Sequence, residues 1–218
     1  MSKTTDTHAV LRRVAVGMLL AFIAKGCDTQ PDLLPMPTID LSMVEPAVRN
    51  RISAANAEFD ASIKSKTSYA DLALAHGELA MVYHAQDLNT PARVAYMNAH
   101  RLDPHDKRWP YLLAHLCADE GKVPEAIKYF EIVRDLDPTY VPAEIYLGQM
   151  YLSNGELDRA RSMFEKARDD KQAKAAALAG LGKVALARGQ YQEAAARLEE
   201  ALEMRPNASR LRQPLAMA

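Results

Sequence analysis

The sequence contains very little cysteine. Of its 218 residues only Cys27 and Cys117 are cysteines, and no CxxC pair is present. A framework of several disulfides is therefore excluded, as is a paired-cysteine metal or redox site. Cys117 lies within an apolar helical pattern, where a thiol usually behaves as a small buried hydrophobic group. The cysteines thus predict neither a disulfide scaffold nor redox chemistry.

An excess of charge of one sign is also missing. The 27 Lys and Arg residues balance 28 Asp and Glu residues, for a net charge of -1, which argues against a strongly basic nucleic-acid-binding protein. Glycines number only 9 and aromatic residues make up 6%. Alanine and leucine are frequent, and these side chains lose little rotamer freedom in a helix. The composition predicts an all-α chain with no nucleic-acid partner.

Familiar catalytic and cofactor motifs are absent from the sequence. It contains no GxxxxGK[ST], HExxH, GxSxG or GxGxxG pattern, so the usual phosphate, zinc, acyl-transfer and dinucleotide sites are not expected. His76 and His84 are eight residues apart, about two helical turns, which is too far to share a metal ion directly. We therefore expect no cofactor, no metal and no enzymatic activity.

The N-terminus has the layout of a secretory signal. Lys3, Arg12 and Arg13 precede the uncharged apolar run VAVGMLLAFIA, residues 14–24, which is too short to span a bilayer as a helix. The following AKGC resembles a bacterial lipobox, although Lys25 departs from the small or apolar residue of that pattern. This resemblance implies a signal peptide over residues 1–26, lipidation of Cys27, and a lipid-anchored protein of the bacterial cell envelope that faces the periplasm. The alternatives are cleavage at a nearby small residue, an uncleaved signal-anchor, or a cytoplasmic protein with an unmodified N-terminus.

Two further segments precede the main pattern. Residues 27–46 are rich in proline and lack a helical period, which predicts an extended tether between membrane and folded domain. From residue 47 the period changes, because Val48, Ile52, Phe59 and Ile63 recur at helical spacing. Residues 47–72 are therefore expected to form a helix and linker that pack on the N-terminal end of the fold.

A 34-residue period dominates the rest of the chain. Pro104 and Pro138 are one period apart and Pro206 follows two periods later, while glycines recur at every period from Gly121 onward. In register, each unit also has a leucine at its seventh position, a small residue at its eighth and alanine at its twentieth, with a large apolar residue at its twenty-fourth. Small residues allow two helices to approach closely, while glycine and proline end helices. The period predicts repeated helical hairpins that stack on one another.

These residues resemble the tetratricopeptide repeat family. The resemblance covers residues 73–206 and implies a right-handed α-solenoid of four units: residues 73–106, 107–140, 141–174 and 175–208. Residues 209–218 would be an incomplete fifth unit or a cap. The third unit has no proline at its end, so its junction with the fourth is expected to be either looser or more continuously helical.

The resemblance also implies a function and a surface. Tetratricopeptide repeat proteins bind a protein or peptide in a concave groove lined by fixed positions of the first helix of each unit. The residues predicted to line this groove are Met81, His84, Arg108, Tyr111, His115, Ile145, Gln149, Leu152 and Lys183. Arg108, Tyr111 and His115 are the expected anchors, because arginine and aromatic residues dominate binding hot spots. We therefore predict a non-catalytic interaction scaffold or adaptor, anchored to a membrane or, alternatively, cytoplasmic.

Overall fold

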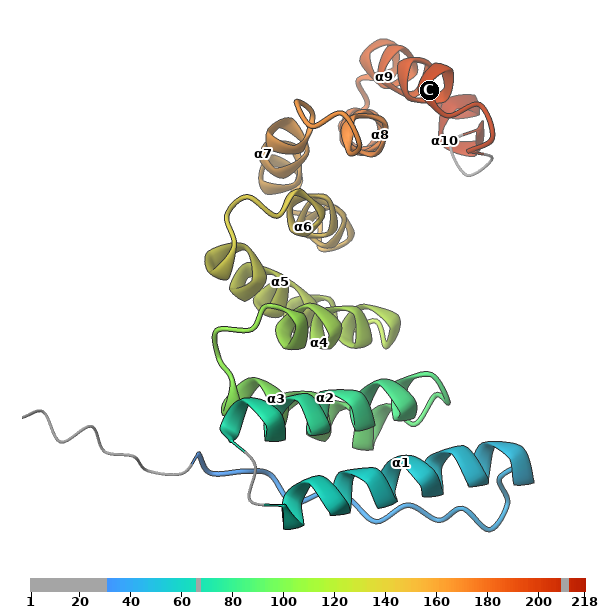
Figure 1. Cartoon of the computed structure of the whole chain (residues 1–218). Coiled ribbons are helices and arrows are strands. Elements are labelled where there is room, and N and C mark those ends of the chain that lie inside the picture. The colour runs from blue at the N-terminus through green and yellow to red at the C-terminus, as the bar shows by residue number, and fades with distance from the viewer. Residues whose placement is uncertain (1–30, 66–67, 209–211) are drawn as a thin grey trace, which may run out of the picture. The chain divides into compact units, whose positions relative to one another are not determined.

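The computed structural model describes residues 31–65, 68–208 and 212–218. Its contacts divide the chain between residues 31 and 32, and the second unit, residues 32–218, is described by itself. All regular elements of the described ranges are helices (Figure 1). None of these helices is both long enough and apolar enough to cross a membrane. In chain order they are α1 (Pro46–Lys64), α2 (Tyr69–His84), α3 (Asn89–Leu102), α4 (Arg108–Asp119), α5 (Val123–Leu136), α6 (Val141–Ser153), α7 (Leu157–Ala167), α8 (Lys174–Ala187), α9 (Tyr191–Met204) and α10 (Arg212–Ala216).

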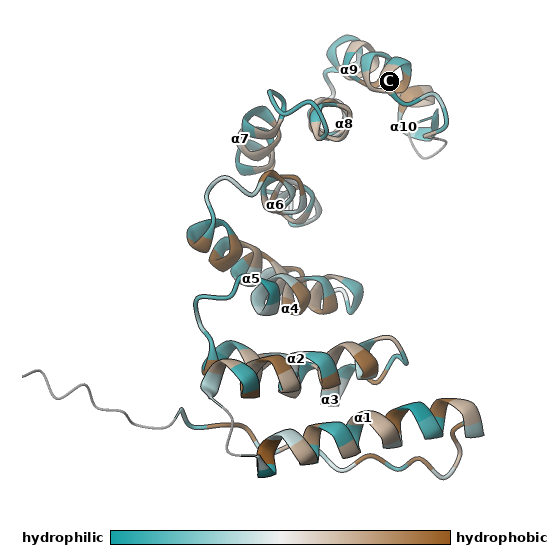
Figure 2. Ribbon diagram, in the orientation of Figure 1, coloured by the Kyte–Doolittle hydropathy of each residue, from teal (hydrophilic) through white to brown (hydrophobic). Residues whose placement is uncertain are grey.

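The helices pack as consecutive hairpins. The pairs α2 and α3, α4 and α5, α6 and α7, and α8 and α9 each form one hairpin, which we number repeats 1 to 4, and each hairpin packs on the next. Most helices carry apolar and polar residues on different sides (Figure 2), as helices with one buried face do. The predicted all-α repeat fold is thereby confirmed.

The first helix of every repeat ends in the same way. A residue with positive φ follows it at the same position of each repeat: Asp87 at 57°, Gly121 at 71°, Gly155 at 77° and Gly189 at 72°. The next backbone N–H then bonds back to a carbonyl five residues earlier, as Lys122 does to Cys117 at 2.8 Å and Glu156 to Tyr151 at 2.8 Å. This geometry satisfies carbonyls that the helix end leaves free. Glycine meets it without strain in three repeats, whereas repeat 1 uses aspartate.

Proline ends the second helix of three repeats. The residues before these prolines, Asp103, Asp137 and Arg205, have φ between -134° and -142°, because proline excludes the helical conformation from the residue that precedes it. Repeat 3 lacks the proline, and α7 ends three positions earlier in its repeat, at Ala167, where the C-cap residue Arg168 stays helical at φ -63°. A turn follows in which the Asp170 carboxylate accepts the backbone N–H groups of Gln172 and Ala173, both at 2.8 Å. The junction is therefore neither a continuous helix nor an unbonded loop.

Aromatic residues on buried glycines fill the space between repeats. The ring of Phe164, 1% exposed, lies where side chains on Gly148 and Gly180 would otherwise stand. Trp109, also 1% exposed, covers Gly77 in the same manner. The small residues let the helices approach, and the rings occupy the volume that remains. These contacts join repeat 3 to repeat 4 and repeat 1 to repeat 2.

The segment before α1 is bound to repeat 1. We call residues 32–41 the strap; it is extended, and Figure 1 shows it as the blue trace leading into α1. The Asn98 side chain, 1% exposed, accepts the Leu34 N–H at 2.8 Å and donates to the Leu34 carbonyl at 2.9 Å. Met36, Ile39 and Leu41 pack against the core of repeat 1. These residues belong to the segment 27–46 that was expected to be an extended tether, and the paired amide bonds and apolar contacts hold them on the folded unit.

Helices outside the four repeats cover their ends. Ile52 and Phe59 of α1 are buried in the same core as α2 and α3. At the other end, Leu215 of α10 packs against a cluster that contains Leu178 and Leu198. Apolar residues of the first and last repeats are thus partly shielded.

Candidate functional site

The sequence-predicted groove residues lie on the first helices of the repeats and differ in exposure. Met81, Arg108, Gln149 and Lys183 are exposed, His84, Tyr111, His115 and Leu152 are half-buried, and Ile145 is buried at 8% exposure. They come from α2, α4, α6 and α8. The structure separates them into two groups with different surroundings, one on repeats 1 and 2 and the other on repeats 3 and 4.

The first group includes an aromatic cluster between repeats 2 and 3. The rings of Tyr111 and His115 are 4.5 Å apart, and His115 lies 4.4 Å from Tyr146 and 5.2 Å from Phe130. Tyr140 closes the cluster at 5.8 Å from Tyr111. All these pairs have the edge-to-face geometry that aromatic rings favour. Tyr111 and His115 thus contribute to the packing between two repeats, in addition to any contact with a partner.

Burial controls the charge state of this cluster. It lowers the pKa of His115, although the nearby Asp119 acts in the opposite direction, and it raises the pKa of Tyr111. The His115 Nε2 atom is buried without a hydrogen-bond partner in the described part of the chain. Burial therefore favours the neutral forms of Tyr111 and His115.

The other members of the first group lie nearer to solvent. Arg108 forms an ion pair with Asp106 at 2.6 Å, and its guanidinium stands 4.6 Å from the centre of the Trp109 ring. His84 Nε2 lies 3.8 Å from the Asp119 carboxylate. Met81 exposes 43% of its surface. Arg108 and His84 thus already have a carboxylate near them within the chain.

The second group lines a pocket between repeats 3 and 4. This pocket, which we call the α6–α8 pocket, has a volume of about 680 Å³. Gln149, Leu152 and Lys183 are the sequence-predicted residues that line it. Its floor includes Phe164 and alanine residues of α8, and Arg205, Asn207 and Ala208 close it from the C-terminal side. Residues of α6, α7 and α8 and of the chain after α9 therefore line one pocket.

An adjoining pocket lies toward repeat 2. We call it the tyrosine pocket because Tyr140 and Tyr146 line it together with Ile145; its volume is about 460 Å³. It shares Gln149 and Ala176 with the α6–α8 pocket. The tyrosines also belong to the aromatic cluster around Tyr111, so the two groups of predicted residues meet here. The pocket surface of repeats 3 and 4 thus adjoins the aromatic cluster that packs repeat 2 against repeat 3.

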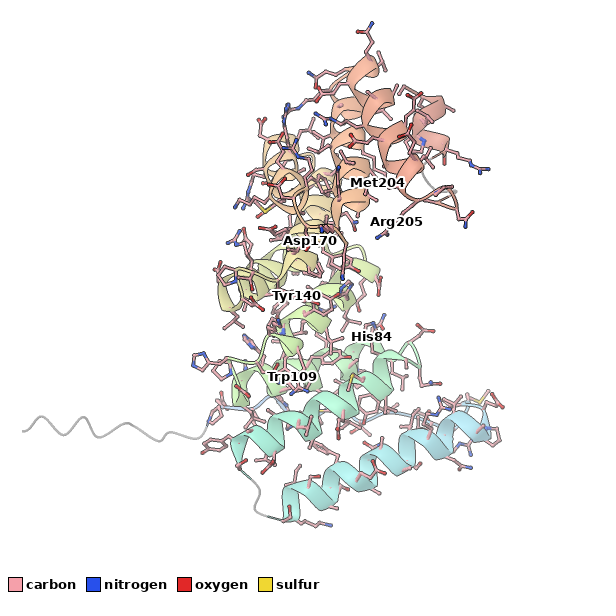
Figure 3. The ribbon with its side chains drawn as sticks, turned by 45° about the horizontal axis from the view of Figure 1, so that its top comes forward. His84, Trp109, Tyr140, Asp170, Met204 and Arg205 are labelled. Carbon is pink, nitrogen blue, oxygen red and sulfur yellow. The ribbon has the colours of Figure 1, made fainter. Side chains whose placement is uncertain are left out.

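Residues that sequence reasoning missed come from the connections between helices. Asp170 borders the tyrosine pocket, and Arg205 borders the α6–α8 pocket. Figure 3 shows them with Tyr140 on the inner side of the stack, on the connections that follow α5, α7 and α9. The sequence signal for Arg205 is its place directly before the repeated proline, which fixes it at the end of α9. Only first-helix positions entered the predicted set, so these loop residues were left out.

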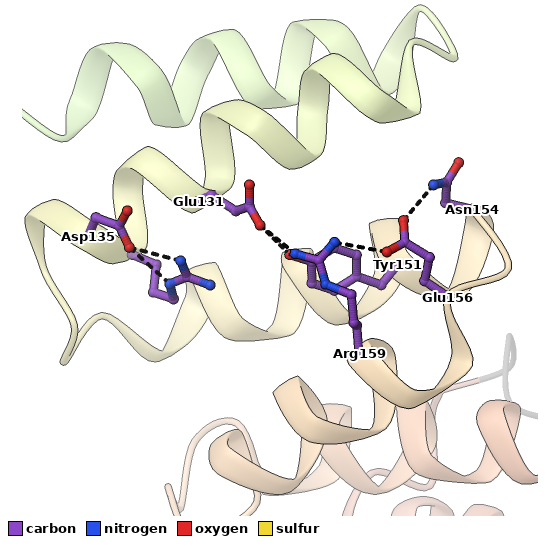
Figure 4. Close-up of polar contacts among 7 residues, drawn as sticks. Glu131, Asp135, Tyr151, Asn154, Glu156 and Arg159 are labelled. Carbon is purple, nitrogen blue, oxygen red and sulfur yellow. Dashed lines mark hydrogen bonds and ion pairs between the residues drawn. The ribbon is translucent and has the colours of Figure 1, made fainter.

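A network of polar side chains lies outside both pockets and joins α5, α6 and α7 (Figure 4). Tyr151 donates to Glu131 at 2.6 Å, and Arg159 donates to the same carboxylate oxygen at 2.6 Å. Burial, followed by the bond to Glu131, raises the pKa of Tyr151 to about 12. A tyrosine held in its neutral form between a carboxylate and a guanidinium is a structural contact rather than an activated nucleophile.

In the described ranges, the side chains that could bind a metal ion are not grouped as metal ligands. They contain no group of three or more His, Cys, Asp or Glu side chains placed to hold a metal ion. His76 packs edge-to-face against Phe59 at 4.6 Å, and burial lowers its pKa to about 4. Its environment is that of a neutral core side chain.

The fold and these surfaces define an all-α helical repeat protein, and comparison with known proteins gives the class of repeat. Residues 142–207 match the family model described as tetratricopeptide repeat. Repeats 3 and 4 are therefore tetratricopeptide repeats, and the described array has the fold of proteins built from them. No curated protein matches the chain in sequence.

Solved structures with a similar fold cover most of the chain. A tetratricopeptide repeat protein from Parabacteroides merdae ATCC 43184 shares 15% identity over 79% of this chain and 72% of its own, with a TM-score of 0.67. YrrB, described as a TPR protein with an unusual peptide-binding site, shares 19% identity over 77% of this chain and 84% of its own, with a TM-score of 0.66. MamA shares 22% identity over 77% of this chain and 95% of its own, with a TM-score of 0.62. At these identities the likeness establishes the fold. Tetratricopeptide repeat proteins are typically non-catalytic scaffolds that bind protein or peptide partners.

Proposed function

We propose that this protein is a non-catalytic scaffold that binds an extended peptide segment of a partner protein along repeats 3 and 4. The observation that carries the proposal is the pair of adjoining pockets, which share Gln149 and Ala176. Together they line a path along α6 and α8 that mixes apolar area with exposed polar groups, as peptide-binding sites do. The peptide-binding site described for YrrB belongs to that protein and supports the proposal only by analogy of fold.

The two pockets offer different contacts to such a segment. The α6–α8 pocket presents the exposed side chains of Gln149, Ser153 and Lys183 beside the Phe164 ring. The tyrosine pocket presents mainly apolar groups. An extended chain places successive side chains on alternate sides, so it can fill both pockets while its backbone meets the amide of Gln149.

A photo-crosslinking experiment tests this site. The photoreactive residue benzoylphenylalanine is placed at Ser153 in the α6–α8 pocket or, as the matched control, at Ser162, which is exposed on α7 and lines neither pocket. The full chain is then illuminated with a pool of random 12-residue peptides. We expect cross-linked peptides from the Ser153 position at several times the yield of the Ser162 position. Equal yields at the two positions would reject binding along repeats 3 and 4.

Membrane anchoring is the second part of the proposal and depends on the sequence alone. Cys27 lies outside the residues that the structure describes, as does the whole segment 1–26 expected to be a signal peptide. We propose that Cys27 carries a lipid that holds the scaffold at a bacterial membrane, facing the periplasm. The alternative is a cytoplasmic adaptor with an unmodified N-terminus.

Metabolic labelling with a clickable fatty acid separates these alternatives. The wild-type chain and a Cys27→Ala variant are compared, and label on the wild type alone supports the anchor. An unlabelled wild-type chain with its N-terminal residues intact would support the cytoplasmic adaptor instead.

A further inference from the structure

The α6–α8 pocket has an uncompensated positive charge. Lys183 and Arg205 are the charged residues that line it, and no carboxylate does. Among the described residues no ion pair involves either of these two side chains. The Arg205 guanidinium donates to the Gln172 carbonyl at 2.9 Å, which orients it without neutralising its charge.

Several other cations of the array are instead held by a carboxylate. Arg108 pairs with Asp106 at 2.6 Å, Lys107 with Asp137 at 2.5 Å, and Arg159 with both Glu131 and Glu156. Lys183 and Arg205 thus combine three properties: they border one hollow, they come from different elements, and both lack a carboxylate partner within the described residues. Charge complementarity therefore indicates an anionic group in the bound segment.

Neutral donors surround the same space. Gln149, Ser153 and Asn207 are exposed and line the pocket, and each has a side chain that can donate a hydrogen bond. A carboxylate accepts several such bonds, and bonds to a charged acceptor are stronger than those between neutral groups. The residue types of the rim therefore favour the same ligand chemistry as the two cations.

The tyrosine pocket gives the bound segment a direction. Its one acidic residue, Asp170, is held at that end of the path by two backbone N–H groups, which donate to its carboxylate. An acidic side chain is repelled there, whereas an apolar or aromatic side chain can pack against Tyr146 and Ile145. The acidic group of the segment therefore belongs at the α6–α8 pocket and its apolar group at the tyrosine pocket.

We infer that the partner segment is an acidic peptide, with Asp or Glu side chains over Lys183 and Arg205 and an apolar or aromatic residue in the tyrosine pocket. This inference rests on the proposed function and specifies its ligand. A pocket of about 680 Å³ with cations on two separate elements suits side-chain carboxylates spread along a chain better than a single terminal carboxylate. Attraction of this kind weakens as salt rises, because the Debye length falls from about 30 Å at 0.01 M salt to about 10 Å at 0.1 M.

A peptide selection tests the inference. A library of random 12-residue peptides with amidated C-termini, which removes the terminal carboxylate, is selected on the full chain. The selection is repeated on a double variant, Lys183→Glu with Arg205→Glu. As a matched control for net charge, it is also run on Arg51→Glu with Lys128→Glu, two exposed positions that line neither pocket.

We expect Asp and Glu next to an apolar residue to be enriched on the wild type and the control variant, and Lys and Arg on the pocket variant. A wild-type-selected peptide should bind about threefold to tenfold more weakly to a Lys183→Ala, Arg205→Ala variant, because two partly exposed charge contacts are lost. Enrichment of peptides that bind in the two pockets but show no preference for acidic residues would overturn this inference and leave the proposed function standing. Selection of acidic peptides that is unchanged on the pocket variant would also overturn it. Failure to enrich any peptide, together with equal cross-linking at Ser153 and Ser162, would reject the proposed function itself.

Discussion

Replacement of Gly77 by alanine tests the packing that joins repeats 1 and 2. Gly77 is buried in α2, and a Cβ at this position would fall within 3.0 Å of three carbons of the Trp109 ring. That ring is 1% exposed and belongs to α4, so it has little freedom to move away. The substitution therefore places a methyl group in space that the indole occupies.

Two opposing effects set the size of the change. Alanine is favoured over glycine within a helix by about 1 kcal/mol. Adding a methyl group to a well-packed core costs about 1–3 kcal/mol, and a rigid, enclosed ring puts Gly77→Ala in the upper part of that range. We expect a net loss of about 1–2 kcal/mol in the free energy of unfolding.

A double-mutant cycle with Trp109→Leu separates the two effects. Without the indole, Gly77→Ala should keep only its helix preference and should stabilise the chain by about 0.5–1 kcal/mol relative to Trp109→Leu alone. Urea unfolding followed by circular dichroism measures all four chains, because the signal does not depend on the single tryptophan. Stabilisation by Gly77→Ala in the wild-type background would refute the contact between Gly77 and Trp109.

Three other predictions test separate parts of the fold. Gly155→Ala should lower the free energy of unfolding by about 1 kcal/mol because φ is 77° at this residue, although nothing lies within 4 Å of the added Cβ. Asp87→Gly at the equivalent position should be neutral or stabilising. A neutral Gly155→Ala would contradict the shared helix ending. Asn98→Ala should cost about 1–3 kcal/mol and speed amide exchange at Leu34, because it removes both side-chain bonds to the Leu34 backbone; unchanged exchange at Leu34 would show that the strap is not held there. The free energy of unfolding should fall as the pH drops from about 6.5 to about 4, because burial lowers the pKa of His76 to about 4 in the folded chain. Between these pH values His76 is protonated in the unfolded chain but not in the folded chain. When urea unfolding is measured at several pH values, His76→Leu should reduce this loss of unfolding free energy by on the order of 2 kcal/mol between about pH 6.5 and pH 4. An unchanged pH dependence would exclude His76 as its source.

Features that recur in three of the four repeats could be predicted from the sequence. Gly121 and Pro138 mark the ends of two helices, and the structure shows φ of 71° at the first and an extended residue before the second. These effects are local, because each follows from the conformational limits of one residue and its immediate neighbours. The same local rules did not predict the positive φ of Asp87, because aspartate is not a strong indicator of this conformation as glycine is.

Features that depend on distant residues could not be predicted. The strap has no periodic pattern of its own, and its position depends on an amide side chain 64 residues later in the chain. Likewise, Arg205 reaches the α6–α8 pocket only because α9 folds back on α8. For the candidate site, the sequence therefore indicated the first-helix positions but not the charged loop residues Asp170 and Arg205.

The most direct test of the account is whether a side chain that fills the shared part of the two pockets blocks peptide binding. Gln149→Trp adds bulk at an exposed residue that lines both pockets, and Gln192→Trp adds the same bulk on α9, outside them. Binding of a library-selected, fluorescently labelled peptide is measured by anisotropy on the full chain, with urea unfolding as a check on folding. We predict at least tenfold weaker binding to Gln149→Trp, unchanged binding to Gln192→Trp, and little change in stability for either. Equal affinity for both variants and the wild type would contradict this prediction.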